Sequence, residues 1–148
     1  MNTAAEWHRD GFRISCDPAA VDRAAVTDFL ASSYWAQGIP RSTVEKSIDG
    51  SLCFALLDGG RQVGFARVVS DLATVAYLGD VYVLPELRGK GLGKWLIECV
   101  MAHPDLQGLR RWMLVTRDAH ELYRPHGFKS LARPEGFMER HDADIYRR

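Results

Sequence analysis

The sequence lacks a long apolar stretch, an excess of charge of either sign and any closely spaced pair of cysteines. No run of apolar residues approaches the roughly 18 that a membrane span needs, and the first residues, MNTAAEWHRDGF, lack the apolar core of a signal peptide. We therefore expect a cytoplasmic protein with no membrane partner. Its 148 residues, 47% hydrophobic and 26% charged, have the length and composition of one folded domain, expected to span residues 1–148.

The cysteines and the charges exclude further classes. Cys16, Cys53 and Cys99 are odd in number and form no CxxC pair, so neither a disulfide framework nor a metal site is indicated. The 19 basic and 19 acidic residues cancel, which excludes a general nucleic-acid-binding protein with a basic surface. The balance hides an asymmetry, because seven basic and ten acidic residues occur through Asp80, and twelve and nine follow it.

Short alternating elements are predicted along the first half of the chain. Asp17 followed by Pro18 is typical of a helix start, and apolar residues at helical spacing continue to Leu30. Asp58-Gly59-Gly60 separates two apolar runs, which is a hairpin signal. The strands expected here cover 11–15, 51–57, 61–69 and 74–83, and the helices cover 17–30 and 41–48. The last three strands would form a meander.

After residue 83 the pattern changes to a glycine-rich basic loop, LPELRGKGLG, which is followed by a helix that Pro104 ends. The later elements expected are a helix over 94–102, a strand over 111–116, a helix that Asp118 caps and that reaches Arg124 or His126, and an extended segment from Gly127-Phe128. This order predicts a mixed α/β (α+β) layer structure.

The glycine-rich loop has the features of an anion site. Its glycines alternate where a strand ends and a helix begins, so backbone N–H groups can face one concavity. A P-loop does not fit, because Trp95 follows Gly93-Lys94 where Ser or Thr is needed. A Rossmann fingerprint does not fit a GxGxG run that lies past the middle of the chain. The remaining alternative is that the glycines only close a tight turn.

Residues 80–93, DVYVLPELRGKGLG, resemble the acetyl-CoA-binding motif of the GNAT family of N-acetyltransferases, Arg/Gln-x-x-Gly-x-Gly/Ala after a strand. Farther on, LYRPHGF is similar to the second family motif and contains Tyr123. With the meander and early helices, the resemblance covers nearly the whole chain. It implies the GNAT fold, a central mixed, mostly antiparallel twisted sheet of six to seven strands flanked by about four helices.

The same resemblance implies an acetyl-CoA-dependent enzyme that acetylates a primary amine of a small molecule or peptide, by direct attack in a ternary complex and without a metal. The loop would bind the pyrophosphate mostly through backbone amides, and the strand before it would offer main-chain groups to the pantetheine arm. The residues implied for acetyl-CoA binding are Val81, Tyr82, Val83, Leu84, Arg88, Gly89, Lys90, Gly91, Leu92, Gly93 and Lys94.

The reaction needs a base and an acid. An amine with a lysine-like pKa near ~10.4 is protonated at neutral pH, so a proton must leave before attack on the thioester, and the departing thiolate benefits from a proton donor. The resemblance implies Tyr123 as the acid, with a packing role as the alternative. It implies Asp80 as the base, directly or through water, but Asp80 could instead cap the strand or pair with a basic side chain. Glu98, His120 and His126 are further candidate bases.

The acceptor site is the least defined part. Adjacent Tyr34 and Trp35 could line an acceptor pocket, or they could form a hydrophobic plug between two helices. Further candidates by position are Arg67, Asp71, Phe137 and Met138. The acidic first half suggests a cationic amine as the acceptor.

Two other function classes stay open. A non-catalytic acyl-CoA-binding module would keep the glycine loop without a working acid and base, and a protein-interaction domain would not need the basic loop. The resemblance also makes a homodimer through the C-terminal strands one of the assemblies to consider.

Overall fold

Six β-strands form the centre of the protein, and their order in the sheet follows their order in the chain. The structure is a computed structural model that describes residues 2–148. The strands are β1 (Glu6–Arg9), β2 (Phe12–Ser15), β3 (Leu52–Asp58), β4 (Arg61–Ser70), β5 (Val75–Val83) and β6 (Arg111–Leu114). Neighbouring strands are antiparallel except β5 and β6, which are parallel. The expected mixed, mostly antiparallel sheet is confirmed.

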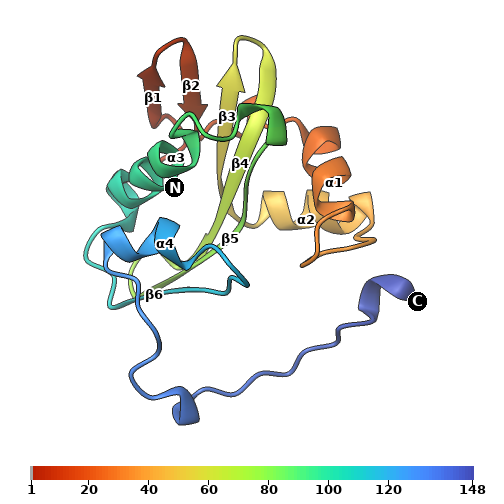
Figure 1. The fold of residues 1–148 in the computed structure, drawn as a ribbon, viewed down its shortest axis with the longest axis vertical. Helices are drawn as coiled ribbons and strands as arrows, with labels where there is room; N and C mark the ends of the chain where they lie inside the picture. Colours follow the sequence, from red (N-terminus) through yellow and green to blue (C-terminus); the bar gives the residue numbers. More distant parts are fainter. Residues whose placement is uncertain (1) are drawn as a thin grey trace.

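Helices cover both faces of the sheet. Helices α1 (Arg23–Ala31) and α2 (Arg41–Asp49) pack on one face, and α3 (Leu92–Ala102) and α4 (His120–Tyr123) pack on the other (Figure 1). Strand β3 is buried from Leu52 to Leu57 because both of its faces are covered. Phe54 belongs to the core beside α3, and Phe65 of β4 belongs to the core beside α1 and α2.

The N-terminal region departs from the sequence-based expectation in two ways. A hairpin of β1 and β2 replaces the single expected strand, with Asp10 and Gly11 in its turn at φ 51° and 83°. The expected helix over 17–30 is interrupted, because Asp17 caps only a 3₁₀ turn at Pro18–Ala20. Helix α1 begins after Asp22, whose carboxylate accepts a hydrogen bond from the backbone N–H of Ala25.

The C-terminal region also differs. Asp118 does not cap α4; the hydroxyl oxygen of Thr116 instead accepts the N–H of Ala119 at 3.0 Å. The extended segment after Gly127 adds no strand to the sheet among the residues described. Residues 129–148 run back beneath the molecule to the loop between α1 and α2 (Figure 1). There Tyr146 packs against the core beside α1 and α2, and its carbonyl lies close to Gly38.

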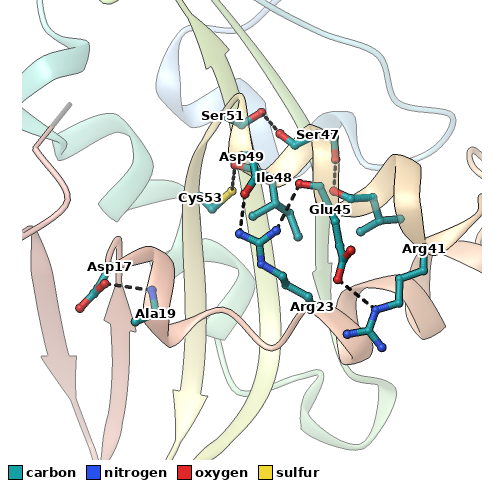
Figure 2. A network of polar contacts seen from close by, with 11 residues as sticks. Asp17, Ala19, Arg23, Arg41, Glu45, Ser47, Ile48, Asp49, Ser51 and Cys53 are labelled. Atoms are coloured by element: carbon teal, nitrogen blue, oxygen red, sulfur yellow. Dashed lines mark hydrogen bonds and ion pairs between the residues drawn. The ribbon is translucent and has the colours of Figure 1, made fainter.

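A polar network joins the start of α1 to the end of α2. The guanidinium of Arg23 donates to the carboxylate of Asp49 at 2.6 Å and to the carbonyl of Glu45 at 3.3 Å (Figure 2). Beyond the end of α2, the hydroxyl of Ser51 donates to the carbonyl of Ser47 at 2.6 Å.

Candidate active site

Strands β5 and β6 separate part of the way along the sheet. Their pairing runs from Val75 with Arg111 to Leu78 with Leu114, where β6 ends, but β5 continues to Val83. Among residues 2–148, no strand pairs with the β6-facing edge of residues 79–83. The sheet therefore has a gap at this end, between the last part of β5 and the segment that follows β6.

The glycine loop and the N-terminus of α3 follow β5 at the end of this gap. Gly89 and Gly91 have φ values of 85° and 77°, a left-handed conformation that glycine adopts without steric cost. Gly91 is the N-cap of α3 and provides no side-chain cap. Within the described chain, the amides of residues 89–94 have no backbone hydrogen-bond acceptor. Unpaired amides at a helix N-terminus, with its partial positive charge, attract an anion.

The basic side chains near the N-terminus of α3 differ in their contacts. The Nε of Arg88 donates to the carbonyl of Val83 at 3.1 Å and so closes the loop. Lys90 and Lys94 are exposed. Sequence reasoning missed Arg9 at the tip of the β1–β2 hairpin, whose Nη2 lies 4.0 Å from the position a Cβ would take on Gly91. The Asp10-Gly11 turn signal could have revealed this hairpin.

The side chains of the motif strand point into the two cores. Val81 and Val83 pack on the α3 side, and Leu84 touches both cores. Tyr82 is buried on the other face, where its ring stacks on Phe29 with centroids 3.8 Å apart. The main chain of residues 81–84 is therefore the part of this strand end that can face the gap between β5 and β6.

Asp80 lies where β5 begins to separate from β6. An irregularity in the β4–β5 register and a φ of 53° at Asp80 turn its carboxylate toward Arg67. The Nε of Arg67 donates to this carboxylate at 2.8 Å, and the two side chains are only 19% and 13% exposed. Arg67 also donates to the hydroxyl of Ser51 at 3.0 Å. Of the sequence-based alternatives, the structure therefore shows pairing with a basic side chain.

Tyr34 and Trp35 bridge the two sides of the gap. The indole N–H of Trp35 donates to Asp80 on the β5 side at 3.0 Å. On the β6 side, the hydroxyl of Tyr34 accepts the backbone N–H of Arg117 at 3.2 Å, and the Arg117 guanidinium carbon lies 3.8 Å from the Tyr34 ring centroid. The two rings meet edge to face at 5.1 Å and are 51% and 42% exposed. They are not a buried plug.

Tyr123 of α4 lies on the α3 side of the same gap. Its side chain is buried, and burial followed by the nearby Tyr34 phenol raises the pKa of Tyr123 to about 12. No hydrogen bond joins its hydroxyl to another residue described, and no fully enclosed polar side-chain atom among these residues lacks a partner, so the hydroxyl oxygen is not completely enclosed. A neutral phenol in this position can donate a proton.

The other candidates lie apart from this arrangement. Glu98 and His120 are exposed, and His126 is half-buried in the turn after α4. Asp71 forms the β4–β5 turn at the opposite end of β5, and Phe137 packs on Arg111 at the start of β6. Within residues 2–148, no group of His, Cys, Asp or Glu side chains is arranged to hold a metal ion. The same residues contain no helix with the length and apolar character needed to cross a membrane.

Comparison with known proteins decides the family. The family model for the acetyltransferase (GNAT) domain matches residues 49–130, more than half of the chain, from the end of α2 to beyond α4. The chain belongs to the GNAT acetyltransferase family. The matched region contains β5, the glycine loop and Tyr123, so the GNAT motifs expected from the sequence lie inside it.

Individual relatives agree with this assignment. A GNAT-family structure from Xanthomonas campestris pv. campestris is 48% identical, covers 94% of this chain and 99% of its own, and has a TM-score of 0.90. A Gibberella zeae protein named as an acetyltransferase is 32% identical over 140 residues, or 79% of this chain and 78% of the relative. A Clostridium acetobutylicum acetyltransferase structure with acetyl-CoA shares the GNAT fold at 12% identity, with a TM-score of 0.64 over 88% of this chain and 94% of that one.

Proposed function

We propose that the protein is an N-acetyltransferase that transfers the acetyl group of acetyl-CoA to a primary amine in a ternary complex. The observation that carries this proposal is the position of the uncapped N-terminus of α3 at one end of the gap between β5 and β6. Such a site suits a pyrophosphate, and the gap beside it suits an extended arm that ends in a thioester.

The donor would lie along this path. The pyrophosphate would contact the amides of residues 89–94, and the pantetheine arm would contact the main chain of residues 81–84. The Clostridium acetobutylicum structure supports the donor, because a protein of the same fold was crystallised with acetyl-CoA. The amide of residue 81 or its neighbours would help to stabilise the oxyanion of the tetrahedral intermediate.

Asp80 and Tyr123 would carry the proton transfers. The carboxylate of Asp80, directly or through water, would take a proton from the ammonium group of the acceptor. The free amine would then form the new C–N bond, and the C–S bond would break as the thiolate leaves. The Tyr123 hydroxyl, which has no hydrogen-bond partner among the residues described, would protonate the thiolate. Tyr34 and Trp35 would line the side from which the amine arrives.

Calorimetry with acetyl-CoA and CoA, followed by assays of thiol release with a panel of primary amines, tests the proposal. We expect both ligands to bind and at least one amine to accelerate thiol release. Absence of binding would overturn the proposal. Binding with only slow hydrolysis would favour the non-catalytic acyl-CoA-binding module.

The base is tested by Asp80→Asn, which preserves an acceptor oxygen for Trp35 and tolerates the positive φ. We expect kcat to fall about 100-fold while the Kd of acetyl-CoA changes little. An unchanged kcat would remove Asp80 from the mechanism.

A further inference from the structure

Exposed aromatic rings gather around the Asp80 carboxylate. Among residues 2–148, the aromatic side chains counted as exposed are Tyr34, Trp35, Tyr77 and Phe137, and three of them lie here. Trp35 bonds to Asp80 directly, and Tyr34 contacts Trp35. The Tyr77 ring folds over Gly79, where a Cβ would lie 3.2 Å from its Cε1 atom.

Glycine at position 79 allows this arrangement of Tyr77. A Cβ there would press on the ring and require it to shift, so the absence of a Cβ leaves room for Tyr77 to lie over residue 79, next to Asp80 in the chain. Val69, the cross-strand neighbour of Tyr77 on β4, is 44% exposed and extends the apolar surface. The Asp80 carboxylate, which also pairs with Arg67, therefore has aromatic side chains and one aliphatic side chain nearby.

Basic side chains balance the negative charge of several carboxylates near Asp80, Tyr34 and Trp35. Four of them have a basic partner within 4 Å: Asp80 with Arg67, Asp118 with Arg117, Asp142 with Arg148, and Asp144 with Arg147. The last two pairs belong to the C-terminal segment that packs beside Tyr34 and Trp35 around a cavity of about 80 Å³. A second or third ammonium group on an acceptor would meet these four carboxylates already paired with arginines.

We propose that the acceptor is a primary monoamine with an aromatic or extended apolar body, which Tyr34, Trp35 and Tyr77 hold while its single amine lies at Asp80. This inference rests on the proposed function and narrows it. The acidic first half of the chain suggested a cationic acceptor in general, but these carboxylates are each balanced by an arginine, so a polycation gains no net attraction from them over a monoamine. Polyamines, aminoglycosides and lysine-rich peptides fall outside this class.

The test compares 2-phenylethylamine with spermidine at saturating acetyl-CoA. We expect kcat/KM to be at least about tenfold higher for 2-phenylethylamine, with a KM that changes less than about twofold between low and high salt, because no surplus charge is screened. An equal or higher kcat/KM for spermidine would overturn the substrate class. So would turnover of neither amine by a protein that binds acetyl-CoA, whereas loss of acetyl-CoA binding would instead overturn the proposed function.

Variants of the rings separate recognition from a structural role. Tyr77→Leu should raise the KM for 2-phenylethylamine about tenfold while changing the KM for propylamine little, since a short amine reaches Asp80 without using this ring. Phe137→Leu is the matched control. Phe137 is likewise an exposed ring, at 39%, but it contacts Arg111 at the start of β6, away from Asp80. An equal rise for both amines, or an equal effect of Phe137→Leu, would contradict ring recognition.

Discussion

At the scale of single residues, Tyr123 combines a buried ring with a hydroxyl that no residue described engages. Because burial raises the pKa of Tyr123 to about 12, the phenol stays neutral throughout the pH range in which amine acetylation is assayed. We expect Tyr123→Phe to lower kcat about 100-fold without changing the Kd of acetyl-CoA, as measured by thiol release and calorimetry. A kcat equal to that of the unaltered protein would show that Tyr123 serves packing alone.

Arg67 has a different role, because it neutralises a carboxylate that is almost fully buried. We expect Arg67→Met to lower the free energy of unfolding by about 3 kcal/mol, since Asp80 would keep a buried charge without its partner. The double variant Arg67→Met/Asp80→Asn should recover part of this loss, because the charge is gone. Urea denaturation measures both, and strictly additive effects would contradict coupling between the two side chains.

At the scale of elements, the function of the glycine loop depends on its backbone conformation. We expect Gly91→Ala to weaken acetyl-CoA binding about tenfold, because a Cβ at φ 77° strains the N-cap and moves the first amides of α3. Gly108→Ala is the control, since Gly108 has a φ of 73° and equally open surroundings after α3. Both variants should lose similar stability, and only Gly91→Ala should lose affinity in calorimetry.

The elements also show what could be predicted from the sequence. The glycine loop and its helix were predictable because glycine spacing, basic charge and helical periodicity are local properties. The ion pair of Arg67 with Asp80 was not predictable, because it depends on an irregular register between β4 and β5. The strand expected after Gly127 was wrong, since residues 129–148 contain Pro134 and closely spaced charges and lack the apolar alternation of a strand.

At the scale of the whole molecule, the C-terminal segment (residues 129–148) packs against the loop that carries Tyr34 and Trp35. We expect Tyr146→Ala to reduce stability by about 1–2 kcal/mol and to raise the KM of the acceptor, because Tyr146 packs under the loop that carries Tyr34 and Trp35. The Kd of acetyl-CoA should not change. Met138→Ala is the control, because Met138 of the same segment is 98% exposed and does not line the cavity beside Tyr34 and Trp35. An effect of equal size there would show that the change does not depend on the packing of Tyr146.

Alkaline pH should destabilise the whole fold. Burial raises the pKa of the thiols of Cys16, Cys53 and Cys99 from 9.0 to about 12, and that of Tyr82 and Tyr123 from 10.0 to about 12. The folded protein therefore retains protons that the unfolded chain releases. This stabilisation is complete below about pH 9 and is lost as the pH rises toward 12. Urea midpoints measured across this range should fall, and a flat profile would contradict the expectation.

The course of the C-terminal segment also bears on how the protein should be produced for these experiments. Arg148 pairs with Asp142, within the stretch that packs against Tyr34 and Trp35, so an affinity tag fused there would start beside the acceptor opening. Asn2, by contrast, donates its N–H to Asp105 in the turn after α3, away from the glycine loop at the other end of that helix. Purification handles belong at the N-terminus, and kinetic data from C-terminally tagged protein should be compared with data from tag-free protein.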